Sequence, residues 1–242
     1  MTTEPSEAAV RLTEVCRSIF DDESQWIEAD GYPDSLALGI IDSIFSTGSH
    51  YTSVVNVITA YRAMRRAEAG DPNSDGVREL LASFDALGGS AGWAEAVNNR
   101  KPAHTGDGAL LKAEVVYRAA LTLASLEDRP IETAADVREA FQRDPELKRI
   151  KKAWLRLPSQ SSGVTFNYLL ILVGLQSVKP DRMVIRFIQE HAGLEDRTVT
   201  PKDAASLISH VAGLYPTAAR KLDHVIWRYV SGREVYRTAD VN

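Results

Sequence analysis

The chain has 242 residues, of which 44% are hydrophobic and 25% are charged, and its formal net charge is −5. These values are typical of a globular protein that buries one large core or folds as two interlocked lobes. The single cysteine, Cys16, excludes an internal disulfide and any site built from several cysteines, such as an iron–sulfur cluster.

The N-terminal segment is acidic. Residues 1–35 hold nine acidic side chains against Arg11 and Arg17, which leaves the rest of the chain slightly basic. Nucleic-acid binding depends on local fields more than on net charge, so a polyanion partner stays open. The opening MTTEPSEAAV lacks a signal-peptide pattern, and no apolar run reaches the ~18 residues of a membrane span. We therefore expect a cytoplasmic protein without a membrane partner.

Helical patterns dominate the chain. Thr133 and Thr200 are typical helix N-caps, and Pro201 suits the first turn of a helix. Segments 70–76 and 98–108 are rich in turn formers and are predicted to be loops. We expect an all-α protein of about ten helices. Apolar residues recur at spacings of three and four in the segments 36–45, 54–64, 77–87, 110–125, 165–175, 183–189, 204–214 and 219–230.

One acid interrupts the first of these helices. Asp42 lies within the otherwise apolar run LALGIIDSIF. It either lines a pocket or caps a turn.

A basic segment comes before a tight turn. LKRIKKAWLR (147–156) carries five basic residues and no acid, and it is either a solvated helix face or a surface for DNA. Pro158 ends this helix, and residues 159–163 form the turn. The next helix begins near Thr165 and is apolar on every side over 168–173, so we expect it to be buried, with Tyr168 in a packing role. Its N-terminus offers N–H groups to phosphate.

These segments resemble the helix-hairpin-helix DNA glycosylases of the endonuclease III-like superfamily. The family pattern is Leu-Pro-Gly-x-Gly, then Thr-Ala and an apolar helix, followed by Val-Asp and an Arg five residues after the Asp. LPSQSSGVTFNYLLIL (157–172) and VKPDRMVIRF (178–187) are similar to the two parts. Asp181 matches the catalytic Asp and Arg186 matches the Arg. The resemblance covers about 33–236 and is strongest over 157–187.

Three departures from the family pattern bear on function. Ser159 and Ser161 stand where the family usually has glycines, which permit positive φ and close approach to phosphate. Gly163 or Val164 stands where bifunctional members carry a lysine nucleophile, so strand cleavage through a Schiff base is not expected. The cysteines of the family's iron–sulfur cluster are absent.

The resemblance implies a two-lobed architecture. One lobe would span 36–179, with the hairpin at about 157–165, and the other would combine 1–35 with 180–242. Asp181 would stabilise positive charge on the sugar and orient water, although an Asp in this position is also a common N-cap. DNA contacts are expected from Ser159, Gln160, Ser161, Ser162, Gly163, Thr165, Lys152, Lys179 and Arg182. The base pocket or the wedge into DNA is expected from Asp42, Phe45, Ser46 and Tyr51.

The leading functional hypothesis is a monomeric, monofunctional DNA glycosylase that flips a base out of double-stranded DNA. Its substrate would be a repair lesion or a hypermodified phage-type base. No cofactor is expected, and a monovalent cation at the hairpin stays open. The alternatives are a catalytically inactive helix-hairpin-helix DNA-binding protein and an all-α interaction module without a DNA role.

Overall fold

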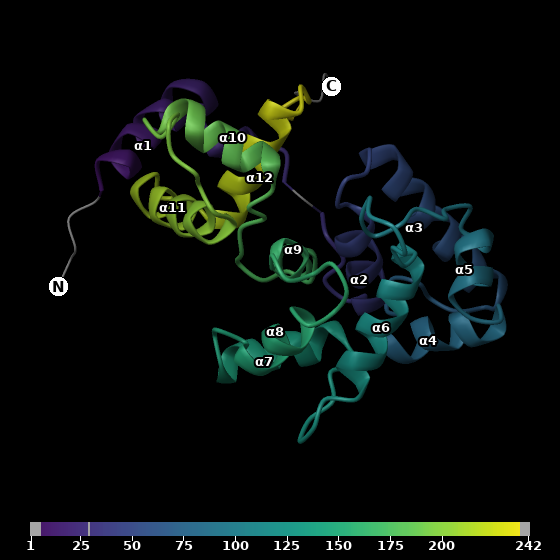
Figure 1. The fold of residues 1–242 in the computed structure, drawn as a ribbon. Coiled ribbons are helices and arrows are strands. Elements are labelled where there is room, and N and C mark those ends of the chain that lie inside the picture. The colour runs from purple at the N-terminus through teal and green to yellow at the C-terminus, as the bar shows by residue number, and fades with distance from the viewer. Residues whose placement is uncertain (1–5, 29, 238–242) are drawn as a thin grey trace, which may run out of the picture. The chain divides into compact units, whose positions relative to one another are not determined.

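The structure is a computed structural model that describes residues 6–28 and 30–237. Over these residues the chain forms twelve α-helices and one short 3-10 helix, with two isolated β-bridges and no strand. The all-α prediction is confirmed. The chain divides into two compact units, which are described one at a time (Figure 1). The first unit contains Met1–Asp30 and Gln176–Asn242, and the second is Gly31–Leu175.

The first unit is a small helical bundle with its own apolar core. Helix α1 packs against α10 and α11, and α12 packs against the same two helices. The rings of Phe20 and Phe187 stack in the core of this unit, with 5.9 Å between their centroids. The periodicity did not predict α1, because its exposed face is rich in charged and polar residues and only every third or fourth side chain is buried. The helices are α1 (Glu7–Phe20), α10 (Arg182–His191), α11 (Pro201–Leu214) and α12 (Ala219–Val230).

The second unit is built around α2. All ten residues of this helix are buried, and it packs against α3, α4, α6 and α9. Segments 70–76 and 98–108 contain no helix, as predicted. The helices of this unit are α2 (Leu36–Phe45), α3 (Tyr51–Ala67), α4 (Val77–Ala86), α5 (Ser90–Ala96), α6 (Lys112–Ala124), α7 (Ala134–Arg143), α8 (Lys148–Trp154) and α9 (Val164–Leu172).

Two glycines let the chain approach α9 closely. A Cβ at Gly39 would lie 3.1 Å from Cδ1 of Leu169, where α2 crosses α9. Gly31 has φ +62°, and a Cβ there would lie 2.7 Å from the carbonyl oxygen of Leu172. The next residue, Tyr32, donates its N–H to that same oxygen at 2.5 Å. The glycines thus place Tyr32 beside α2 and α9.

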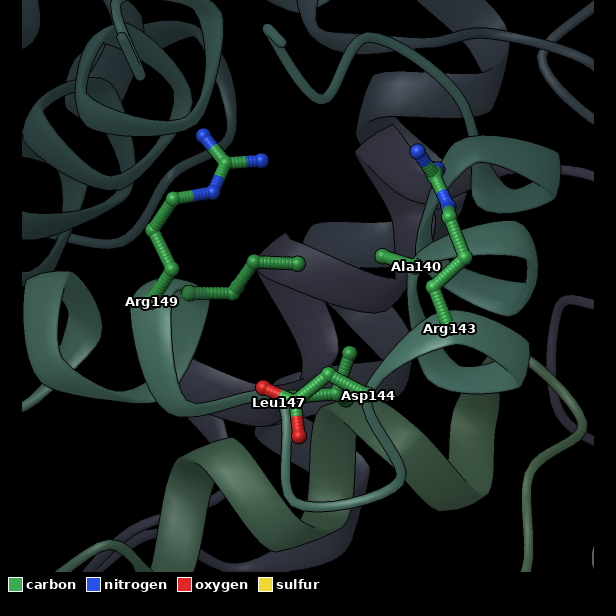
Figure 2. Close-up of a pocket in the computed structure, with 6 residues that line it drawn as sticks. Ala140, Arg143, Asp144, Leu147 and Arg149 are labelled. Atoms are coloured by element: carbon green, nitrogen blue, oxygen red, sulfur yellow. The ribbon is translucent and has the colours of Figure 1, made fainter. Parts of the chain in front are cut away.

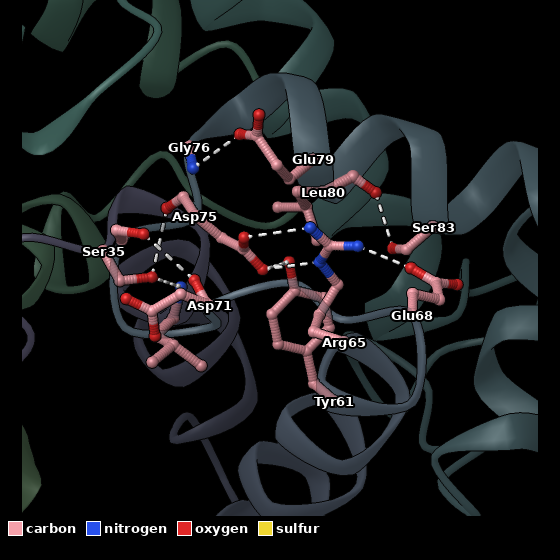
Figure 3. Close-up of polar contacts among 12 residues, drawn as sticks. Ser35, Tyr61, Arg65, Glu68, Asp71, Asp75, Gly76, Glu79, Leu80 and Ser83 are labelled. Carbon is pink, nitrogen blue, oxygen red and sulfur yellow. Dashed lines mark hydrogen bonds and ion pairs between the residues drawn. The ribbon is translucent and has the colours of Figure 1, made fainter.

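A buried ion pair anchors the start of α2 (Figure 3). The carboxylate of Asp75 accepts hydrogen bonds from the Tyr61 hydroxyl at 2.8 Å and from Nε of Arg65 at 2.7 Å. Its backbone carbonyl accepts from the Ser35 hydroxyl at 3.1 Å and from the N–H of Ala37 at 3.1 Å. These bonds fix the loop before α4 to both α2 and α3.

Across the described part of the chain, none of the helices has the length and apolar character needed to span a membrane.

Candidate active site

Asp181 lies on a rigid turn in the first unit. Its N–H donates to the carbonyl of Lys179 at 2.7 Å across the buried Pro180, whose ring fixes the backbone. One carboxylate oxygen, Oδ1, accepts the N–H groups of Met183 at 2.8 Å and Val184 at 3.2 Å. Asp181 is therefore the N-cap of α10. The same turn leaves the side chain partly exposed, with Oδ2 outside the cap.

A second carboxyl group lies beneath this turn. Asp223 of α12 is 4% exposed, and it accepts the backbone N–H of Lys179. Burial raises the pKa of Asp223 well above its usual range, and the negative charge of Asp181 adds to the rise. Asp223 is thus a buried group that holds the turn from below.

Cationic groups surround the neighbouring His224. Burial lowers the pKa of His224 to about 4, and the positive charges of Arg228, Lys179, Arg220 and Arg233 contribute to the same shift. The imidazole stacks on Trp227 at 5.7 Å between ring centroids. Cationic side chains therefore lie near His224, the residue next to Asp223.

Lys179, Arg182 and Arg186 complete this region. Lys179 is partly buried, while Arg182 and Arg186 are exposed on α10. Arg186 places Nη2 3.8 Å from the sulfur of Met183. Among the predicted site residues, the first unit brings together Asp181, Lys179 and Arg182.

The predicted hairpin lies in the second unit, between α8 and α9. Thr165 donates its hydroxyl to the side-chain carbonyl of Gln160 at 2.5 Å and accepts Nε1–H of Trp154 at 2.9 Å. The Gln160 amide donates to the carbonyl of Pro158 at 3.1 Å. Gln160 and Thr165 are both 3% exposed. Their side chains therefore shape the hairpin from inside, a different role from the phosphate contact expected for them.

The hairpin backbone uses two left-handed residues. Ser159 has φ 64° and Gly163 has φ 75°. A serine at the first position accepts a conformation that glycine adopts without strain. The backbone at position 159 therefore suits glycine, and the serine adopts it at some cost. Ser161 and Ser162 are exposed at the tip, where their hydroxyls are accessible.

Helix α8 presents a basic face before the hairpin. Lys151, Lys152 and Arg156 are exposed, and within the described residues no acid forms an ion pair with them. Lys148, in contrast, pairs with Glu146 at 2.7 Å. The predicted contact Lys152 therefore belongs to a set of cations that are available to a polyanion.

A shallow groove of about 140 Å³ lies beside this face (Figure 2). Arg143 and Arg149 stand on opposite walls. Arg149 donates to the carbonyls of Glu127 and Arg129 at 2.7 and 2.8 Å, and Arg143 pairs with Glu139 at 3.5 Å. Both guanidinium groups thus have protein partners, and none of the predicted site residues lines this groove.

The loop after α2 is fixed by a buried lysine. Lys112 is 1% exposed, and its Nζ donates to the carbonyls of Phe45 at 2.8 Å and of Thr47, and to the hydroxyl of Ser49 at 3.0 Å. Phe45 is 1% exposed, and its ring centroid lies 6.2 Å from that of Trp93 in the core. Phe45 would have to leave the core to act as a wedge, whereas Ser46 is partly exposed at the loop.

The predicted pocket residue Asp42 is the centre of a polar cluster. Its Oδ2 accepts the hydroxyl of Tyr32 at 2.8 Å, and its carboxylate also accepts the hydroxyl of Tyr168. The packing role expected for Tyr168 is therefore incomplete, because its hydroxyl bonds to a buried acid. Tyr51 lies close enough to raise the pKa of both other tyrosines.

The sequence patterns missed four polar residues that the structure places at these sites. Tyr32, Arg62, Lys112 and Asp223 gave no local signal that separated them from packing or surface positions. A charged residue inside an apolar helix segment does give a local signal of this kind, and among the residues of these sites only Asp42 was recognised by it. Across the described ranges, no three His, Cys, Asp or Glu side chains gather as a metal site would require.

The comparisons with known proteins yield a family. The model of a domain of unknown function, DUF8548, matches residues 10–231, which include helices of both units. No curated protein and no solved structure matches the chain. Because the match covers more than half of its length, the chain belongs to the family of the domain of unknown function DUF8548.

Proposed function

We propose that the protein is a monofunctional DNA glycosylase that hydrolyses the N-glycosidic bond of a damaged or modified base. The observation that carries the proposal is the way in which the Asp181 side chain is held. Its Oδ1 is fixed by two backbone N–H groups, and its partly exposed side chain lies on a proline-stiffened turn. A carboxylate held in this way is preorganised to face a developing positive charge.

The reaction requires little covalent work from the protein. The bond between C1′ of the sugar and the base nitrogen breaks, and the electron pair leaves with the base. Positive charge then develops on the sugar, and the Asp181 carboxylate stabilises it. Water adds its oxygen to C1′, and its proton goes to the carboxylate and then to the departing base. A base inside duplex DNA must first be flipped out, at a cost of roughly a few kcal/mol.

The hairpin and α8 would hold the DNA backbone. The exposed hydroxyls of Ser161 and Ser162 and the charges of Lys151 and Lys152 suit phosphate oxygens and carry no base information. Gly163 and Val164 offer no amine, so the proposed activity ends with base release and does not cut the strand. The proposed activity acts on double-stranded DNA, in repair or in defence against modified foreign DNA.

A DNA-binding protein without catalysis is the second candidate. Ser159, in a left-handed conformation that suits glycine, favours this candidate. A hairpin that departs from the family's glycine pattern can bind DNA without placing a base for excision. Both candidates predict DNA binding that weakens with salt. Only the glycosylase releases a base.

The decisive experiment measures free bases released from DNA by mass spectrometry. The panel holds alkylated, oxidised and deaminated bases and phage DNA with modified cytosines. Asparagine caps helices about as well as aspartate, so Asp181→Asn keeps α10 intact and removes only the charge. The matched control is Asp203→Asn, which changes an exposed acid in the first turn of α11 in the same unit.

We expect release by the wild type and the control, and a loss of at least about 100-fold in Asp181→Asn with equal DNA affinity. Salt-dependent binding without release from any DNA in the panel would support the binding-only candidate. Release that is equal in all three proteins would remove Asp181 from the mechanism.

A further inference from the structure

The cluster around Asp42 has a composition that the core of the second unit does not need. Every other side chain of α2 that faces the core is apolar or a small hydroxyl, yet Asp42 is 3% exposed. A buried carboxylate costs several kcal/mol unless strong hydrogen bonds offset the loss of water. Well-packed apolar residues usually stabilise a core as well or better. Stability alone therefore does not account for Asp42.

Two separate elements supply the polar partners of Asp42. Tyr32 precedes α2 and donates its hydroxyl to Oδ2 of Asp42 at 2.8 Å. Tyr168 belongs to α9 and donates to the same carboxylate. Burial raises the pKa of both tyrosines, and the negative charge of Asp42 adds to the rise, so both hydroxyls stay protonated donors. The carboxylate thus accepts two tyrosine hydroxyls.

Helix α3 adds a cation and an exposed ring. Tyr51 and Arg62 are about three helical turns apart and lie on the same face of the helix. The guanidinium carbon of Arg62 lies 5.6 Å from the ring centroid of Tyr32. Its Nε is buried and bonds to no partner within the described residues. Tyr51 is 42% exposed, so the cluster reaches the surface of the unit.

The donor and acceptor pattern of this cluster selects a ligand. A carboxylate only accepts hydrogen bonds, whereas a guanidinium only donates them. An exocyclic amino group beside a ring nitrogen or carbonyl offers a donor next to an acceptor, which complements this pair. Tyrosine rings add faces on which a planar base can stack. A carbonyl oxygen in place of the amino group would direct its lone pairs at the carboxylate.

We propose that the cluster of Tyr32, Asp42, Tyr51, Arg62 and Tyr168 is a recognition site for a nucleobase that carries an exocyclic amino group. The bases of this class are those of the adenine, cytosine and guanine types. Uracil, thymine and hypoxanthine present a carbonyl at the corresponding position and would be rejected. The inference rests on the proposed function, because it names the substrate class of the same enzyme.

The test compares each amino base with the analogue in which a carbonyl replaces the amino group. Otherwise identical duplexes carry 5-hydroxymethylcytosine or 5-hydroxymethyluracil, and adenine or hypoxanthine, and base release gives kcat/KM for each. We expect a preference of about 100-fold or more for an amino base over its carbonyl counterpart, since a site that bonds an N–H rejects analogues without it. Equal rates, or faster release of the carbonyl base, overturn the inference.

Two variants assign the preference to the cluster. Asp42→Asn should reduce it at least about 10-fold, because an amide both donates and accepts. Tyr168→Phe keeps the ring, removes one bond to Asp42 and should reduce the preference less. The control is Ser43→Ala on the same helix, whose buried hydroxyl donates to the carbonyl of Ile40 at 3.0 Å. A preference that survives in Asp42→Asn, in a folded protein, refutes the assignment.

A binding measurement separates the inference from the proposed function. If no duplex releases a base, the glycosylase proposal fails, and the site is tested by NMR of labelled tyrosine rings in the full chain. Adenosine and cytidine at millimolar concentration should shift the Tyr32 and Tyr168 signals, whereas inosine and uridine should not. Shifts by the amino nucleosides alone, lost in Asp42→Asn, support the site without the enzyme. No shift with any nucleoside overturns it.

Discussion

We expect Asp223 to make the free energy of unfolding depend on pH. It is 4% exposed below the Asp181 turn, and its pKa is raised by burial first and by the charge of Asp181 second. The folded state then binds this proton at a pH where the unfolded state, with a pKa of about 3.9, has lost it. The contribution of Asp223 to stability therefore decreases as pH rises above about 4. A single proton changes the free energy of unfolding by at most about 1.4 kcal/mol per pH unit.

His224 acts in the opposite sense. Its pKa is lowered from 6.5 to about 4 by burial and by the surrounding cations. The unfolded state therefore binds a proton between these values that the folded state does not. Its contribution to stability is complete above pH 6.5 and is lost as pH falls toward 4, to a total of about 3 kcal/mol. The two slopes therefore oppose one another below pH 6.5, and His224 adds no slope above it.

Asp223→Asn isolates the first slope. The amide is neutral at every pH and its oxygen can still accept the N–H of Lys179, so the turn is preserved. Urea denaturation followed by circular dichroism at half-unit steps from pH 5 to pH 9 gives the free energy of unfolding. We expect the variant to gain on the wild type as pH rises, by up to about 1.4 kcal/mol per unit.

Subtracting the wild-type free energy of unfolding from that of Asp223→Asn removes the contribution of titratable groups that both proteins share. His224→Gln should flatten the curve below pH 6.5 and leave the higher range unchanged. A difference between Asp223→Asn and the wild type that stays constant from pH 5 upward would contradict the reasoning, because it would mean that Asp223 is already ionised in the folded protein at pH 5.

Three further changes test other parts of the structure. Asp75→Asn removes the buried carboxylate from Arg65, which keeps only its ion pair with the exposed Glu68, and should lower the free energy of unfolding by roughly 1–3 kcal/mol in urea. The exposed control Asp71→Asn should stay within about 0.5 kcal/mol. Ser159→Gly relieves a left-handed backbone at φ 64° and should raise stability by roughly 0.5 kcal/mol; a loss of stability would argue against that geometry. Lys152→Ala should reduce the slope of log Kd against log salt for duplex DNA by about 0.9, and an unchanged slope would remove α8 from the DNA surface.

The class of the fold could be predicted from local patterns, because the apolar periodicity of the helices and their caps are local. Thr133 and Thr200 cap α7 and α11 through hydrogen bonds to Asp136 and Asp203, as their sequences indicate. Helix α1 was missed because its buried stripe is short of large apolar residues and its other faces are charged. Asp181 could be predicted as an N-cap from its place before an amphipathic helix, and both bonds of that cap are present.

The tertiary partners could not be predicted in this way. Nothing near Lys112 in the sequence indicates that its ammonium reaches the loop after α2, more than sixty residues earlier in the chain. The same holds for Asp223 and the Lys179 turn, and for Tyr168 and Asp42. Each of these pairs joins residues that are far apart in sequence, so no periodicity or cap pattern reports them.

The buried carboxyl groups bear on the proposed activity. Asp42, Asp75 and Asp223 are each at most 4% exposed, yet they differ in what surrounds them. Asp75 has an arginine and a tyrosine that satisfy it, as a structural ion pair requires. Asp223 has a backbone N–H and an uncompensated burial that favours its neutral form, beside a second acid that is partly exposed. Burial thus favours the neutral form of Asp223 beneath a turn that carries a second, partly exposed acid, and the proposed activity would use this contrast in environment.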